Sequence, residues 1–145
     1  MFLVVLNSFL AVTAILGNAV ILAALHKESS LHPPSKILIR SLALTDLFVG
    51  ILVEPLFAVF LMIAKYENLN LCYPVIATVL SVGVPLFYVS LFTVTAISVD
   101  RLLALSLGMR YRQVVTFKRV LAIMICLWIV SFAIGTFGFL NNPIL

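Results

Sequence analysis

The sequence predicts an all-α membrane protein, a helical bundle with four transmembrane helices. Hydrophobic residues make up 64% of the 145 residues and charged residues only 10%, whereas about a quarter of a soluble domain is charged. The hydrophobic residues gather in four segments, each longer than the roughly 20 residues that a helix needs to cross a bilayer. Because lipid offers no hydrogen-bond partners to the backbone, these segments are expected to be helices.

The four expected helices form one partial transmembrane domain over residues 1–145. Their approximate ranges are 1–26, 36–64, 72–106 and 117–141. The first segment has no basic n-region, and its apolar run exceeds the ~7–15 residues of a signal-peptide core, so we expect it to be retained. Short connections make consecutive helices antiparallel neighbours. Pro33 and Pro34 predict an extended turn before the second helix.

The basic residues are unevenly distributed along the chain. Eight of the nine lie in the first and third connections or the adjoining helix ends, and only Lys65 lies in the second connection. The positive-inside rule places the first and third connections in the cytoplasm and the N-terminus outside, in a multi-pass protein. Nucleic acid is not an expected partner, because membrane lipid surrounds the helices and separates the basic clusters.

Two carboxylates lie within the second apolar segment. Asp46 costs about 2.5 to 3.5 kcal/mol on insertion scales unless it is paired or hydrated. It is therefore either functional or a protonated group bonded to a neighbouring helix, and Asn18 and Ser90 are its candidate neighbours. Glu54 lies ~12 Å farther along the helix, next to Pro55, which is expected to kink it. Glu54 either faces a water-filled ligand cavity or is solvated at the headgroup level.

The outer half of the third segment carries a second irregularity. Gly83 and Pro85 are expected to loosen the helix, and irregular backbone at this depth is tolerated where it lines a cavity. The alternative is an ordinary kinked helix whose hydroxyl groups bond back to its own carbonyls. The candidate ligand pocket comprises Glu54, Gly83, Val84, Phe87 and Tyr88.

Trp128 and the two cysteines complete the candidate residues. Trp128 lies ~15 Å along the fourth helix from Lys118, so it is expected to pack between helices with its N–H bonded. Cys72 lies at the outer mouth of the third helix and Cys126 ~12 Å deep in the fourth, too far apart for a disulfide. Cys72 is either free or pairs with a segment that this sequence does not contain.

Catalysis and metal binding are not expected. The sequence offers no nucleophile paired with a base, and its two histidines lie in the first connection without other metal ligands.

Several motifs in order along the chain resemble the rhodopsin-like (class A) G-protein-coupled receptor family. They are Gly17-Asn18, Leu42-Ala43 with Asp46 and Pro55, Asp100-Arg101 after Ala96-Ile97-Ser98-Val99, Arg110-Tyr111 with Thr116 and Arg119, and Trp128. The resemblance covers the whole chain but only four of the family's seven helices. It implies that the full-length protein binds an extracellular ligand and activates a heterotrimeric G protein, and that this fragment alone does not signal.

The resemblance also implies roles for individual residues. Asp100 would hold Arg101 at rest and release it toward the G protein, as one half of a two-state lock. Asn18, Asp46 and Ser90 would form an allosteric sodium site, the one cofactor expected.

The sequence differs from the family pattern at four positions. Leu102 replaces a tyrosine and Gly108 replaces a common loop proline. Cys72 lies about one helical turn farther from Arg101 than the family's disulfide cysteine, so its pairing with a loop absent here is in doubt. Gly83 stands where amine receptors carry an aspartate, which argues against an amine ligand unless Glu54 substitutes.

Two other interpretations remain open. A complete four-helix scaffold resembling tetraspanins is one, although those proteins carry a large cysteine-rich outer loop and the second connection here is short with one cysteine. A transporter fragment is the other, suggested by Asp46 and Glu54 in one helix. It predicts an internal repeat, which the sequence does not show.

Overall fold

The computed structural model describes residues 2–29, 32–66 and 69–141, and over these ranges the chain is almost entirely helical without a strand. Four helical stretches are long and apolar enough to cross a membrane. The elements in chain order are α1 (Phe2–Lys27), α2 (Pro33–Phe48), the π-helix η1 (Val49–Val53), α3 (Glu54–Lys65), α4 (Leu69–Leu107), the 3₁₀ helix η2 (Gly108–Arg110), α5 (Tyr111–Val114) and α6 (Phe117–Asn141).

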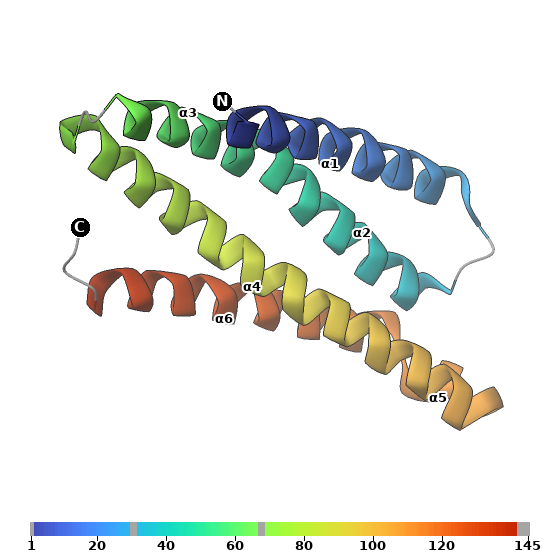
Figure 1. Ribbon diagram of the computed structural model, residues 1–145. Helices are drawn as coiled ribbons and strands as arrows, with labels where there is room; N and C mark the ends of the chain where they lie inside the picture. Colours follow the sequence, from blue (N-terminus) through green and yellow to red (C-terminus); the bar gives the residue numbers. More distant parts are fainter. Residues whose placement is uncertain (1, 30–31, 67–68, 142–145) are drawn as a thin grey trace.

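The long helix α4 organises the bundle, because it packs against α2, α3 and α6, while α1 packs against α2 and α3. Figure 1 shows the N-terminus beside α3, at the end of the molecule where α3 connects to α4. The α1–α2 connection and α5 lie at the opposite end. The two connections in which the sequence concentrates basic residues therefore share one end of the bundle.

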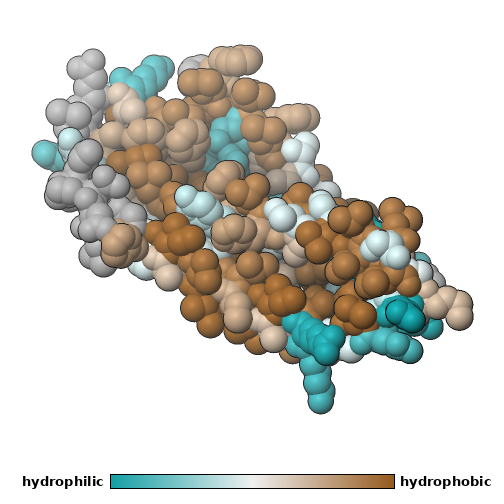
Figure 2. Space-filling view, turned by 90° about the horizontal axis from the view of Figure 1, so that it is seen from below, coloured by the Kyte–Doolittle hydropathy of each residue, from teal (hydrophilic) through white to brown (hydrophobic). Residues whose placement is uncertain are grey.

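Apolar side chains cover the outside of the bundle as well as its inside. Phe2, Phe9 and Val20 on α1 and Ile129 on α6 are each more than 60% exposed. A helix that is apolar all round belongs in lipid, where such side chains face acyl chains. Figure 2 shows hydrophobic residues over most of one face, with a group of hydrophilic side chains at one end and a few elsewhere.

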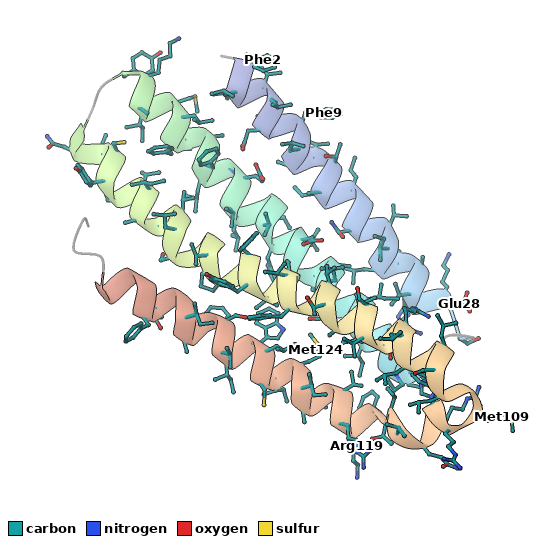
Figure 3. All side chains as sticks on the ribbon, turned by 60° about the horizontal axis from the view of Figure 1, so that its bottom comes forward. Phe2, Phe9, Glu28, Met109, Arg119 and Met124 are labelled. Carbon is teal, nitrogen blue, oxygen red and sulfur yellow. The ribbon has the colours of Figure 1, made fainter. Side chains whose placement is uncertain are left out.

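A cluster of buried apolar side chains lies toward the end of the bundle that holds α5. It joins Leu38 of α2, Val115 after α5, and Val120 and Met124 of α6. Figure 3 shows α4 and α6 side by side over this region, with Met124 labelled on α6. Partly buried residues of α4, such as Ala96 and Leu103, pack against the cluster. This core fixes the last turns of α4 relative to α2 and α6, and so positions the site described below.

Pro33 and Pro34 lie inside a helix, not in the connection expected from the sequence. Pro33 and Pro34 form the first turn of α2, so α2 begins three residues before the expected position 36. The first N–H groups of a helix have no partner within the helix, so proline costs no hydrogen bond there. The third crossing likewise begins at Leu69 rather than residue 72, with Pro74 just inside α4.

The second crossing changes helix type just before Pro55. In η1 the N–H of Glu54 bonds to the carbonyl of Val49, five residues earlier. Pro55 has no N–H, and its ring would clash with a carbonyl in the turn before it, so the turn widens to accommodate it. Gly50 in this wide turn is buried against α1, where an added Cβ would lie 3.0 Å from Ile15 Cγ1.

The predicted irregularity at Gly83 and Pro85 is not visible as a break, because α4 continues through both residues. Pro85 is almost fully buried. Its ring packs against Gly135 of α6, where an added Cβ would lie 2.5 Å from Pro85 Cγ. A glycine on the facing helix therefore makes room for the proline ring, and the two helices approach closely there.

Candidate functional site

The carboxylate of Asp100, near the end of α4, is buried and doubly hydrogen-bonded. Its side chain is only 5% exposed. Ser35 Oγ donates to one carboxylate oxygen at 2.8 Å, and the Tyr111 hydroxyl donates to the other at 2.5 Å. The Ser35 and Tyr111 oxygens lie 3.2 Å apart. Hydrogen bonds to a carboxylate are stronger than those between neutral groups, so the network ties three elements together.

Local backbone structure brings these partners to Asp100. Ser35 belongs to the first turn of α2, which exists because the helix begins at Pro33. Gly108 has a φ of 50°, a conformation that favours glycine, and it lets the chain turn after α4. Tyr111 is the first residue of α5, and its side chain reaches back to Asp100 on α4. The ring centroids of Tyr111 and His32 lie 5.3 Å apart.

Arg101 does not contact its neighbour Asp100 in the way expected. Within residues 2–29, 32–66 and 69–141 no ion pair joins them, and the Arg101 side chain is exposed. Consecutive residues on a helix do not face each other, so an inward Asp100 directs Arg101 outward. The structure therefore does not show the expected resting contact between Asp100 and Arg101. Ser35 and Tyr111 bond to the Asp100 carboxylate instead.

Exposed apolar residues accompany Arg101 at this end of the molecule. Leu105 is 86% exposed and Met109 is 96% exposed. Figure 3 shows Met109 at the extreme end of the molecule, beyond the last turn of α4. The segments that follow carry four exposed basic side chains: Arg110, Arg112, Lys118 and Arg119. We call Arg101 and Leu105 of α4, together with Met109 of the following η2, the exposed end of α4.

Leu105 and Met109 were not among the predicted site residues, and neither Ser35 nor Tyr111 was a predicted partner of Asp100. The spacing of four residues between Arg101 and Leu105 was a usable signal, because it is close to one helical turn. Ser35 and Tyr111 gave no such signal.

Removing the donors of Asp100 is expected to destabilise the protein. In Ser35→Ala with Tyr111→Phe, the buried carboxylate loses both protein donors, and we expect a loss of about 1 to 3 kcal/mol. Thermal unfolding in detergent, followed by intrinsic fluorescence, measures the change. The control pair is Ser106→Ala with Tyr66→Phe, since both residues are exposed. Equal effects of the two pairs would show that the network does not stabilise the fold.

A second polar cluster lies deeper, between α2 and α4. Ser90 Oγ lies 3.1 Å from Asp46 Oδ1 and 3.2 Å from Thr45 Oγ1. The structure thus brings Asp46 and Ser90 together, as predicted. Asn18 instead donates to the carbonyl of Ala14 in its own helix at 2.8 Å. Among the described residues, no hydrogen bond joins Asn18 to Asp46, so two of the three expected residues meet.

The expected ligand-pocket residues do not converge. Gly83 faces the second crossing, where an added Cβ would lie 3.3 Å from Val53 Cγ1. Phe87 is 62% exposed, and Tyr88 stacks on Phe92 with ring centroids 6.1 Å apart. Val84 and Glu54 are half-buried on α4 and α3.

Two further polar side chains join helices across the bundle. The buried Asn7 of α1, which the sequence did not single out, donates to the backbone carbonyl of Glu54 at 2.7 Å. Trp128 Nε1 donates to Ser41 Oγ at 3.4 Å, which provides the indole with its expected partner. Cys72 and Cys126 are both free.

Comparison with known proteins decides the family. A sequence model described as 7 transmembrane receptor (rhodopsin family) matches residues 17–142. The chain belongs to this receptor family. Its four apolar helices are accordingly the first four crossings of a multi-pass membrane receptor, and the scaffold and transporter interpretations are not favoured.

Several curated relatives of this rhodopsin-family chain are adenosine receptors. Adenosine receptor A2b of Rattus norvegicus is 33% identical over 138 residues, which cover 95% of this chain and 40% of the relative. Adenosine receptor A2a of Homo sapiens is 34% identical over 126 residues, which cover 87% of this chain and 29% of that receptor. Adenosine receptor A3 of Canis lupus familiaris is 34% identical over 123 residues, which cover 84% of this chain and 37% of that receptor. The chain thus spans less than half the length of these relatives.

Proposed function

We propose that the full-length protein is a plasma-membrane receptor that binds an extracellular ligand and activates a heterotrimeric G protein through the exposed end of α4. The observation that carries this proposal is the pairing of a buried, anchored Asp100 with an outward Arg101. The hydrogen bonds of Asp100 hold the end of α4 in place, so the exposed guanidinium group of Arg101 has a defined position from which to contact a partner protein. Leu105 and Met109 add apolar surface beside it, and arginine with apolar side chains is typical of protein interfaces.

The Asp100 network gives this end of the receptor a contact that activation can change. It links α4 to α2 and to the connection before α6, so movement of α4 strains two hydrogen bonds to one carboxylate. A switch requires an element with two arrangements and a local contact that favours one of them. In this proposal Ser35 and Tyr111 favour the resting arrangement, and Arg101 contacts the G protein in the active one.

The distribution of basic residues supports an orientation with this end in the cytoplasm. Lys36, Arg40, Arg101, Arg110 and Lys118 belong to the elements at the end that holds α5, and the N-terminus lies at the other end. By the positive-inside rule the N-terminus is extracellular. Labelling by a membrane-impermeant thiol reagent in intact cells tests this, with cysteine introduced at Tyr66 or at Arg112 after Cys72 and Cys126 are replaced by serine. Labelling at Arg112 and not at Tyr66 would contradict the orientation.

The proposed activity is tested directly by nucleotide exchange. The purified full-length protein in nanodiscs is mixed with each class of heterotrimeric G protein, and guanine-nucleotide exchange is followed with and without ligand. Faster exchange in at least one class supports the proposal. An absence of acceleration in every class, with ligand binding intact, would contradict it.

Adenosine is the ligand to test first, since the relatives at 31% to 34% identity are adenosine receptors. The place where amine receptors carry aspartate is Gly83 in this chain, which supports a ligand without an ammonium group. Competition of adenosine and a biogenic amine for binding separates the two classes. Binding of the amine alone would point to Glu54 as its counter-ion.

Asp46 and Ser90 support a sodium site, with oxygen ligands from two helices. We expect sodium to lower agonist affinity in the full-length receptor by about fivefold or more, a usual strength of allosteric coupling. Asp46→Asn removes the negative charge at nearly constant volume, and the sodium effect should disappear. Agonist competition in sodium and in potassium buffer measures it, with Asp46→Glu as the charge-retaining control. Undiminished sodium sensitivity in Asp46→Asn would exclude this site.

A further inference from the structure

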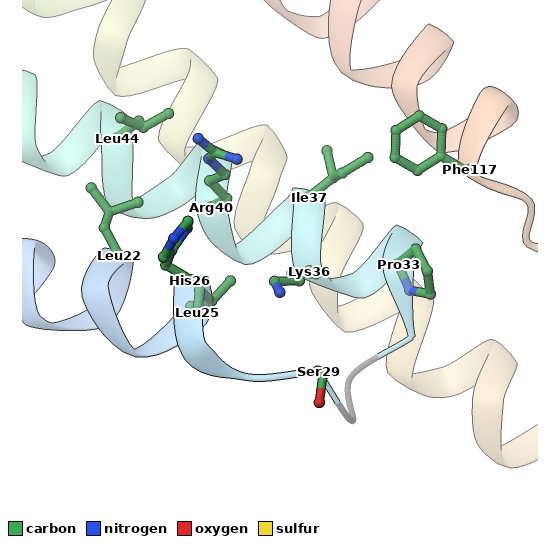
Figure 4. A pocket seen from close by; sticks show the side chains of 10 residues that line it. All are labelled: Leu22, Leu25, His26, Ser29, Pro33, Lys36, Ile37, Arg40, Leu44 and Phe117. Carbon is green, nitrogen blue, oxygen red and sulfur yellow. The ribbon is translucent and has the colours of Figure 1, made fainter.

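A cavity of about 460 Å³ opens between the last turns of α1, the first turns of α2 and the start of α6. Figure 4 shows its lining side chains, with His26 from α1, Lys36 and Arg40 from α2 and Phe117 from α6. It lies on the outside of the bundle, away from Asp100 and the exposed end of α4. The proposed coupling to a G protein does not use it.

Nitrogen donors gather at one side of this cavity. Lys36 and Arg40 are four residues apart on α2, so their side chains lie on the same face of the helix. Lys36 Nζ donates to the backbone carbonyl of Glu28 at 2.5 Å, which fixes the ammonium group across the α1–α2 connection. His26 contributes an imidazole from the facing helix. The described lining residues include no aspartate or glutamate, so the cavity suits an anion.

The rest of the lining is apolar and extends toward the bilayer. Leu22 lies one turn deeper than His26, and Leu44 one turn deeper than Arg40, each about 6 Å farther along its helix. Ile37 and Phe117 close the side toward α6. The cavity therefore carries cationic donors at the level where the helices end and hydrocarbon surface below them.

We propose that this cavity binds the headgroup of an anionic membrane phospholipid, with an acyl chain along Leu22 and Leu44. The charges match a phosphate group, and basic pockets between transmembrane helices on the cytoplasmic side suit such headgroups. Arginine can bind phosphate through two N–H groups at once. A soluble phosphate compound would use the donors but leave the apolar wall unfilled. The proposal rests on the proposed orientation, because anionic lipids are concentrated in the cytoplasmic leaflet.

The test measures binding of a fluorescent phosphatidylinositol bisphosphate to the full-length protein in phosphatidylcholine nanodiscs. We expect Lys36→Gln with Arg40→Gln to weaken binding about 25-fold, or about fivefold for each charge removed. The matched control is Arg110→Gln with Arg112→Gln, which removes the same charge from an exposed part of the third connection. Lys36→Arg with Arg40→Lys keeps both charges and should bind within a few-fold of the unmodified protein.

Each outcome decides the proposal. Strong weakening in the α2 pair with little change in the control pair supports a lipid site in this cavity. Equal weakening of lipid binding in both pairs would show a general attraction to basic residues and would overturn the proposal. Unchanged lipid binding in the α2 pair would also overturn the proposal. Displacement of the lipid by soluble inositol trisphosphate at similar concentration would show a free phosphate site instead.

The readout is independent of the proposed receptor activity. Nanodiscs expose both leaflets, so lipid binding does not require a particular orientation or a G protein. A protein that binds the lipid but does not accelerate nucleotide exchange refutes the proposed function and leaves the site intact. Thermal unfolding of each variant identifies loss of folding, which the exposed Arg40 and half-buried Lys36 are not expected to cause.

Discussion

Arg101→Gln in the full-length receptor is expected to reduce G-protein activation by about 30-fold or more while ligand binding persists. Truncating one partner of a buried charged contact at an interface costs about 2 to 5 kcal/mol, and Arg101 would be buried only when the G protein is bound. The residue is exposed, and among the described residues it forms no ion pair. Its removal therefore leaves no unpaired group within the receptor. Agonist-stimulated nucleotide exchange measures the loss.

Two companion variants separate the arginine's role from general charge. Arg101→Lys keeps the charge but loses the planar fork of donors, so we expect it to recover only part of the activity. Arg112→Gln removes one exposed charge from α5 nearby and should reduce exchange by less than threefold, typical of an exposed ion pair. Full activity in Arg101→Gln would contradict the proposed role of the exposed end of α4.

Much of the fold could be predicted because membrane insertion imposes long apolar segments. The four crossings follow from length and composition alone. Their facing surfaces do not, because α1 and α6 are apolar all round, so that the side toward lipid and the side toward protein look alike in the sequence. The start of α2 at Pro33 was missed for another reason. Pro33 and Pro34 were expected to form an extended turn before the helix, although proline is compatible with a first helical turn.

Some contacts of the candidate site could likewise be predicted from the sequence, and others could not. The proximity of Asp46 and Ser90 could be predicted, because both are polar groups at a similar depth in largely apolar helices. The partners of Asp100 could not, because the contact with Tyr111 depends on the turn at Gly108 and on how α2 crosses α4. Adjacency in sequence suggested Arg101, but adjacent residues on a helix point in different directions.

Gly135→Val is expected to destabilise the bundle by about 1 to 3 kcal/mol or more, through overpacking between α4 and α6. An added Cβ at this position would lie 2.5 Å from Cγ and 3.0 Å from Cδ of Pro85, closer than carbon atoms approach. The proline ring cannot turn aside as a flexible side chain does, so the helices must separate. Val89 of α4, one turn beyond Pro85, is fully buried and would lose contacts as they part.

Ala133→Val is the matched control, because it adds a β-branched side chain two residues earlier on α6 at an exposed position. Both variants introduce a β-branched residue into the helix, but Gly135→Val also removes a glycine, which is about 1 kcal/mol less favourable in a helix than alanine. Any greater loss of stability in Gly135→Val than in Ala133→Val therefore comes from the contact with Pro85. Thermal unfolding of the two proteins in the same detergent gives that difference. Replacing Pro85 by alanine in the Gly135→Val background should recover part of the lost stability, because the atoms that clash are removed. Equal stability of Gly135→Val and Ala133→Val would mean that α4 and α6 do not pack closely at these residues.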